Sequence, residues 1–320
     1  MARRGLRGGH VQTVASFLMQ RRFNLPAPEE RFIEVAPGIQ VLCHCHWQAD
    51  RTKPLTIIIV HGLEGSSDSG YSLGVAEKAL AAGMNVIRYN QRNCGGTDAL
   101  APVLYHSGLS DDVAVVAREL IERDGISQLA LVGFSMGGNL VLKLAGEWGL
   151  REDRPPQFRA VAACCPAMDL AASADALHEP ANRLYELFFL FSLRRRMIQK
   201  ANLFPGHFDA GRMRGMRSLR DFDHQITAYY CGFSSADDYY ARSSASNVVD
   251  KITVPAMILH AANDPFIRIL PETRRKIGAN PNITFVEAED GGHCAFVGSR
   301  KGEGDGFWAE SQIVNFLRGI

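Results

Sequence analysis

The feature that most constrains this chain is the pentapeptide Gly-Phe-Ser-Met-Gly at residues 133–137. An apolar run that predicts a buried strand precedes it at 128–132, and a helical pattern follows at 137–148. A sharp turn between a strand and a helix lifts a serine Oγ clear of the sheet, and the flanking glycines leave room where a Cβ would collide. Ser135 is therefore predicted to be a nucleophile. A glycine-rich turn with a capping serine is the plainer alternative.

Apolar runs and helical patterns alternate along most of the chain. The run LTIIIV at 55–60 is continuous and β-branched, which is typical of a strand buried on both faces. Repeated spacing of strand and then helix predicts an α/β fold with a mostly parallel, doubly wound sheet. The other expected strands are 30–35, 40–47, 84–89, 159–164, 254–260 and 283–287, and the other expected helices are 71–82, 111–123, 271–278 and 307–317.

Between residues 167 and 246 the alternation stops. The segment has aromatic and arginine-rich helical patterns and no clear strand, so we predict an inserted helical cap at 167–246 and a core formed by 1–166 and 247–320. Its aromatic run at 184–191 suits the lining of an acyl tunnel, with Leu187 and Phe188 as candidate substrate contacts. Packing of the cap against its neighbours explains the same run equally well.

Two later residues supply the groups that a serine nucleophile needs. A serine hydroxyl requires an adjacent base, and in this architecture the order along the chain is serine, acid, histidine. Asp264 and His293 follow the last two predicted strands, at the sheet edge where an open parallel sheet places its site. We predict that Asp264 orients His293, which takes the proton of Ser135. Asp169 is the alternative acid, although capping of the first cap helix is the role we favour for it.

The segment His-Gly-Leu-Glu-Gly at 61–65 follows the buried strand 55–60. A loop at this place supplies one backbone N–H of an oxyanion hole, and the residue after the nucleophile supplies the other. The predicted donors are the main-chain N–H groups of Leu63 and Met136. His61 stands beside the glycines, so packing of the loop is a better explanation for it than a role as the base.

Longer motifs extend along the chain. The most specific are HGLEGSSDSGY at 61–71 and GFSMGGN at 133–139. Weaker ones are HVQT at 10–13, NQRNCGG at 90–96, YHSG at 105–108, ADDYY at 236–240, NDPF at 263–266 and GGH at 291–293. Together they resemble the YheT-like branch of the α/β-hydrolase superfamily. The resemblance implies the α/β-hydrolase fold and ester hydrolysis or acyl transfer without a cofactor.

The chain departs from this family at three positions. Asn93 stands where the family usually has glycine, so the loop at Arg92 is expected to differ in shape. Asn263 replaces a frequent aspartate, which leaves Asp264 as the one acid of its loop. Cys294 follows the histidine where a small or aliphatic residue is more usual. None of the three changes removes a group that the mechanism needs.

Composition excludes several other classes. Seven scattered cysteines, an odd number, indicate reduced thiols in a cytoplasmic protein. The Cys-His-Cys-His run at 43–46 fits a half-buried strand better than a metal site, because alternate side chains point to opposite faces. The net charge of +1 gives no reason to expect nucleic-acid binding. The apolar stretch at 14–19 is too short for a signal peptide, and the ten-residue run at 184–193 is about half of a membrane span.

We therefore expect a carboxylic ester hydrolase that acts on a small hydrophobic acyl ester through an acyl-enzyme, with no cofactor and no metal. An acyltransferase that uses an alcohol acceptor and a non-catalytic small-ligand receptor are the alternatives. Residues 183–220 carry nine basic side chains against two acidic ones. Peripheral membrane contact through this cap is one explanation of the basic side chains, and solvated helix faces are the one we favour.

Overall fold

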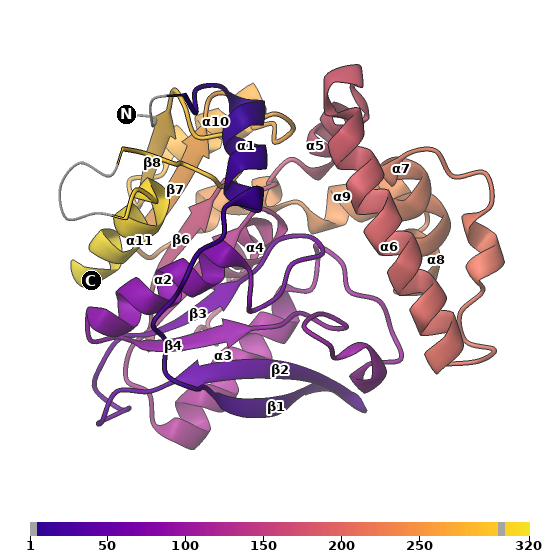
Figure 1. Cartoon of the computed structure of the whole chain (residues 1–320). Coiled ribbons are helices and arrows are strands. Elements are labelled where there is room, and N and C mark those ends of the chain that lie inside the picture. Colours follow the sequence, from indigo (N-terminus) through magenta and orange to yellow (C-terminus); the bar gives the residue numbers. More distant parts are fainter. Residues whose placement is uncertain (1–4, 300–304) are drawn as a thin grey trace.

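The computed structural model describes residues 5–299 and 305–320 (Figure 1). Among these residues, eight strands form one sheet in the order β1-β2-β4-β3-β5-β6-β7-β8. The strands are β1 (Glu29–Ala36), β2 (Ile39–His46), β3 (Thr56–Val60), β4 (Asn85–Tyr89), β5 (Leu129–Phe134), β6 (Phe158–Cys164), β7 (Ala256–Ala261) and β8 (Ile283–Ala288). The first two strands join the sheet antiparallel, and every pairing from β4 to β8 is parallel.

Helices cover both faces of this sheet. The helices on one face are α2 (Gly70–Ala81) and α11 (Trp308–Arg318), and those on the other are α3 (Ser110–Asp124), α4 (Met136–Gly149) and α10 (Pro271–Ala279). The central strands are buried along their whole length, because apolar side chains on both faces pack against helices. The predicted doubly wound, mostly parallel fold is confirmed.

The segment between β6 and β7 forms a separate group of helices at one side of the sheet (Figure 1). It contains no strand between residues 167 and 246, all of which the structure describes. The helices are α5 (Leu170–His178), α6 (Arg183–Leu203), α7 (Leu219–Phe222), a π-helix (Asp223–Thr227), α8 (Ala228–Cys231) and α9 (Ala236–Ser243). They enclose an apolar cluster that also includes Phe266 and Ile267 from the loop after β7. Below we call residues 167–246 the cap.

Short 3-10 turns complete the described secondary structure. They are Asp98–Leu100, Pro180–Asn182, Ala210–Met213, Ala245–Asn247 and Val249–Lys251. None of the helices that the structure describes is both long enough and apolar enough to cross a membrane.

A helix that we did not predict, α1 (Gly9–Leu18), precedes the sheet. It lies beside the loop that follows β8, because the side chains of Thr13 and Gln12 accept hydrogen bonds from the backbone N–H groups of His293 and Val297, both at 2.8 Å. The start of the chain therefore contributes to the edge of the sheet at which the site was predicted.

Candidate active site

Ser135 occupies the turn between β5 and α4. Its φ of 54° and ψ of −118° lie in a region that side chains other than glycine rarely adopt. A Cβ at Gly133 would collide with the backbone of Gly137, and one at Gly137 would collide with the carbonyl of Val60. The glycines therefore let α4 pack closely against β5 and β3, and this packing holds the serine in its strained conformation.

His293 connects Ser135 to Asp264 by hydrogen bonds. Its Nε2 lies 2.9 Å from Ser135 Oγ, and its Nδ1 lies 2.9 Å from Asp264 Oδ2. The three side chains come from the loops after β5, β8 and β7, which all leave the same edge of the sheet. The structure thus brings together the three residues that the sequence singled out, in the order serine, histidine, aspartate.

The carboxylate of Asp264 is fully buried. Its Oδ1 accepts hydrogen bonds from the backbone N–H groups of Phe266, at 3.1 Å, and Ile267, at 2.9 Å. Burial alone would raise the pKa of this carboxyl, but the charge of His293 and its hydrogen bond, together with the two amides, lower the pKa below its ordinary value. An ionised carboxylate at Nδ1 fixes the imidazole tautomer and stabilises an imidazolium.

The loop that carries His293 is held by Asn263. Asn263 Oδ1 accepts hydrogen bonds from Gly291 N–H at 3.1 Å and Gly292 N–H at 3.0 Å, while its Nδ2 donates to Asp290 at 2.6 Å. An aspartate at position 263 would place a second negative charge against Asp290 and would lose this donor. The departure from the family pattern at this position therefore suits its surroundings.

Leu63 and Met136, the predicted backbone donors of an oxyanion hole, line the same cavity as Ser135. The N–H groups on either side of Leu63 are engaged, since Gly62 donates to Tyr71 at 2.9 Å and Glu64 to Tyr105 at 3.0 Å. Met136 is the first residue of α4, where a backbone N–H has no partner within the helix. Leu63 and Met136 also pack in one apolar cluster. The role of their N–H groups as oxyanion donors stays a prediction.

Arg196 on α6 connects this loop to the cap. Its Nε donates to Glu64 Oε1 at 2.8 Å and its Nη1 to Asp98 at 2.9 Å. Glu64, which has a positive φ of 56°, also accepts a hydrogen bond from Tyr105 at 2.7 Å. Sequence reasoning missed Arg196 because its partners lie about a hundred residues away along the chain. The one available signal was Glu64, which lies within the long motif at 61–71.

A cavity of about 100 Å³ lies between core and cap, and Ser135 lines it. Most of the other lining side chains are apolar, among them Leu104, Leu170, Leu177, Phe189, Leu193 and Met197. Leu187 and Phe188, which we expected to contact substrate, are not among the lining residues, and their side chains are 47% and 50% exposed. The helical repeat of 3.6 residues explains this correction, because Leu190, Leu193 and Met197 face inward and so turn positions 187 and 188 outward.

A family model described as the alpha/beta hydrolase fold matches residues 56–299 of this chain. The chain belongs to the α/β-hydrolase family. A putative esterase, YheT of Escherichia coli K12, is 30% identical over 319 residues, which cover 98% of this chain and 91% of YheT. The resemblance to the YheT-like branch is therefore confirmed.

Other relatives of this α/β-hydrolase are more distant. The bovine phospholipase ABHD3 is 25% identical over 79% of the chain, which spans 60% of the length of that protein. Among solved structures, the 2,6-dihydroxy-pseudo-oxynicotine hydrolase aligns with a TM-score of 0.61 at 15% identity, over 97% of this chain and 71% of that one. The Pyrococcus furiosus esterase Pf2001 gives 0.58 at 16% identity, over 94% and 98%. These structural likenesses show the fold.

Asp169 has a different role in this hydrolase from the one we favoured. It stands at the N-cap position of α5, but its side chain does not bond to that helix. Its carboxylate instead accepts hydrogen bonds from the N–H of Leu270 at 2.9 Å and the hydroxyl of Thr273 at 2.8 Å. The expected capping of the first cap helix is wrong, because the carboxylate holds the start of α10.

His61 is buried and packs the loop that carries Leu63. Its Nδ1 lies 2.8 Å from the carbonyl oxygen of Gly62, and its Nε2 accepts a hydrogen bond from Gln91 N–H at 3.2 Å. Burial lowers the pKa of this imidazole to about 4. Both ring nitrogens are occupied by the backbone, as expected for a residue that packs the loop.

Asp223 is a buried carboxylate that also lines the cavity. It begins the π-helix and accepts hydrogen bonds from Tyr240 at 2.7 Å and Thr227 at 2.8 Å. Burial raises the pKa of Asp223 to about 6. Nothing in the sequence pattern singled this residue out.

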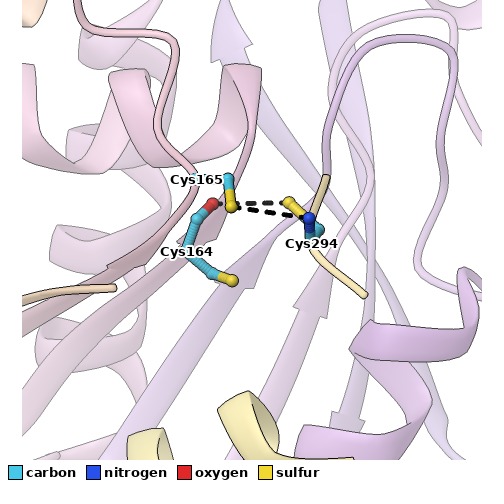
Figure 2. A group of neighbouring side chains, drawn as sticks. All are labelled: Cys164, Cys165 and Cys294. Carbon is cyan, nitrogen blue, oxygen red and sulfur yellow. Dashed lines mark hydrogen bonds between the residues drawn. The ribbon is translucent and has the colours of Figure 1, made fainter. Parts of the chain in front are cut away.

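Three cysteines, Cys164, Cys165 and Cys294, lie together (Figure 2), and the Cys294 sulfur is 3.9 Å from His293 Nε2. Cys294 donates its N–H to the sulfur of Cys165 and its thiol to the carbonyl of Cys164, both at 3.5 Å. Their three sulfurs lie within 4.8 Å of one another, close enough to share a soft metal ion. Burial raises the pKa of all three thiols well above its ordinary value. The thiolate form that binds metal is therefore disfavoured.

Proposed function

We propose that this chain hydrolyses carboxylic esters with a hydrophobic acyl group, with Ser135 as nucleophile, His293 as general base and Asp264 as the acid behind it. The observation that carries this proposal is the pair of 2.9 Å hydrogen bonds that link the three side chains. The names of relatives support it, since they include a putative esterase, a phospholipase and a yeast monoacylglycerol lipase.

In the first half-reaction, Ser135 Oγ attacks the acyl carbonyl carbon while His293 Nε2 takes the hydroxyl proton. The negative charge that develops on the carbonyl oxygen meets the N–H groups of Leu63 and Met136. The carbon–oxygen bond of the ester then breaks, and the leaving alcohol takes the proton from His293. The acyl group remains on Ser135.

In the second half-reaction, His293 removes a proton from a water molecule, and the resulting hydroxide attacks the acyl carbon. The bond to Ser135 Oγ breaks, the serine recovers a proton from His293, and the carboxylic acid leaves. Asp264 stays ionised throughout, because its amide and imidazole partners stabilise the charge.

The cavity supports a short acyl chain as the substrate class. It is apolar for most of its lining and measures about 100 Å³. A cavity of about 150 Å³ holds one benzene molecule, so this one has room for no more than about six carbon atoms. We infer that the preferred acyl chain is short.

We also propose a cytoplasmic location. All seven cysteines are free thiols in the structure, and five of them are buried. Reduced cysteines are typical of proteins in a reducing compartment.

A labelling and activity assay tests the nucleophile. Ser135→Ala should abolish labelling by a fluorophosphonate probe and lower kcat for p-nitrophenyl butyrate by up to about 10⁶. The matched control is Ser173→Ala, because this serine lines the same cavity but bonds to the backbone of Arg268. It should keep kcat within about tenfold. Equal labelling of wild type and Ser135→Ala would overturn the proposal, as would a wild-type protein that the probe does not label.

A further inference from the structure

Two neighbouring helices expose apolar side chains toward the same surface. On α6, Leu184, Phe188 and Phe191 are 81%, 50% and 70% exposed, and their spacing of three or four residues places them on one side of the helix. On α1, Val14, Phe17 and Leu18 are 44%, 72% and 70% exposed. We call these six residues the apolar surface.

The apolar surface is continuous across both helices. The rings of Phe17 and Phe188 meet edge to face with centroids 5.5 Å apart, and His10 stacks on Tyr185 at 5.7 Å. In Figure 1, α1 lies at the top of the molecule, and the long helix α6 runs from the top down the side of the cap. Contiguous exposed apolar patches are uncommon on proteins that meet only water, and they mark surfaces that bind a partner.

The two helices also contact the candidate active site. Thr13 on α1 accepts the backbone N–H of His293 at 2.8 Å. Tyr185 on α6 packs on Phe266 with ring centroids 5.3 Å apart, and Phe266 packs on the imidazole of His293 at 4.4 Å. Whatever covers the apolar surface therefore lies beside the site that would cleave an ester.

The charges around the apolar surface favour a negatively charged partner. The helix α1 contains no acidic residue, and the one acidic residue of α6, Glu186, is fully buried. Two exposed arginines are close to these helices in the chain: Arg22 lies four residues after the end of α1, and Arg195 lies one turn beyond Phe191 in the exposed stripe of α6. Apolar side chains bordered by arginine are the composition of segments that bind anionic bilayers.

We propose that the apolar surface docks this protein on an anionic phospholipid bilayer, with α1 and α6 in the interface. The part of this inference that concerns substrate rests on the proposed function: the ester would reach the cavity from the lipid side. A second copy of the chain fits less well. In a two-fold dimer, the apolar surface of one copy would pack against the same surface of the other copy. Arginines of the two copies would then face one another, and the interface would cover the site.

Vesicle flotation tests the docking without turnover. Ser135→Ala protein should float with vesicles of phosphatidylcholine that contain about one third phosphatidylglycerol, and much less with pure phosphatidylcholine or at high salt. The triple variant Phe17→Ser/Leu184→Ser/Phe191→Ser should bind the anionic vesicles at least about tenfold more weakly than its parent, because the inserted apolar area is lost.

The matched control is Leu150→Ser. Leu150 is 62% exposed, but it follows the end of α4, which runs back from Ser135 to the opposite edge of the sheet. This variant should float like its parent. In the background with Ser135 intact, the triple variant should keep kcat/KM on a soluble ester. It should lose about tenfold on the same acyl ester embedded in anionic vesicles.

Three results would overturn the docking: no flotation with anionic vesicles, equal flotation of the triple variant, or a dimer in solution that the triple variant converts to monomer. The last would show that a second copy covers the surface. Failure of the proposed function is a separate outcome, because a protein that floats but does not hydrolyse esters supports the docking and contradicts only the chemistry.

Discussion

The positions of single site residues could be predicted from the sequence where the topology of the sheet determines them. The carboxyl ends of parallel strands meet at one edge of the sheet, so Ser135, Asp264 and His293 could be expected together from their positions after three strands. Contacts between side chains from distant loops could not be predicted in this way. Asn263 and Arg196 support the site through such contacts, and their partners follow from packing that no local pattern reports.

The two candidate acids can be separated by substitution. Asp264→Asn should lower kcat by about 10⁴, because the amide favours the wrong imidazole tautomer at His293. Asp169→Asn should leave kcat nearly unchanged and cost about 1 kcal/mol of stability, since it weakens hydrogen bonds to Leu270 and Thr273. Steady-state kinetics and urea unfolding of both variants measure the two effects. The reverse pattern would assign the acid to position 169.

At the scale of elements, the sequence predicted that α6 is a helix but not which side faces inward. Residues 184–191 are almost all apolar, so the pattern has no polar side from which to read the orientation. The orientation is set by Glu186, which is fully buried and bonds to His178 at 3.0 Å and to Leu219 N–H at 2.8 Å.

The π-helix that Asp223 begins gives a test of stability against pH. Burial raises the pKa of Asp223 in the folded protein to about 6, above its value in the unfolded chain. The contribution of this residue to the free energy of unfolding is therefore fully present below about pH 4 and is lost as the pH rises through about 6. Ionisation should then cost about 3 kcal/mol. The asparagine of Asp223→Asn cannot ionise. The unfolding free energy of this variant relative to wild type should therefore rise by about this amount between pH 4 and pH 7.5.

Urea unfolding at several pH values measures this difference. The control is Asp237→Asn, whose parent side chain is 80% exposed and which should keep the pH dependence of wild type. A constant difference between Asp223→Asn and wild type across the pH range would show that Asp223 is ionised at low cost.

At the scale of the whole molecule, alternation of strands and helices predicted the doubly wound sheet, and its interruption predicted where a helical segment leaves the core. The division of the chain into core and cap domains stays a prediction. The cavity could not be foreseen, since its lining combines residues such as Leu104, Leu193 and Phe266 that are far apart in the chain. Volume between elements follows from three-dimensional packing rather than from any repeat.

The cavity between core and cap predicts how activity depends on acyl-chain length. Each methylene buried there contributes about 0.8 kcal/mol, so kcat/KM for p-nitrophenyl esters should rise three- to fourfold per carbon from acetyl until the cavity is full. With a volume of about 100 Å³, the optimum should lie at or below about six carbons. Leu193→Trp fills part of the cavity and should move the optimum toward acetyl.

Leu187→Trp is the matched control, since this side chain is on the same helix but outside the cavity, and it should leave the optimum unchanged. Retained kcat/KM on the acetyl ester shows that Leu193→Trp is folded. A shift caused by Leu187→Trp and not by Leu193→Trp would restore the acyl tunnel first expected along 184–191. If kcat/KM of the wild type is highest for the acetyl ester and falls steadily with chain length, the acyl chain binds outside this cavity. An apolar cavity open to the nucleophile should increase kcat/KM with each carbon that enters it.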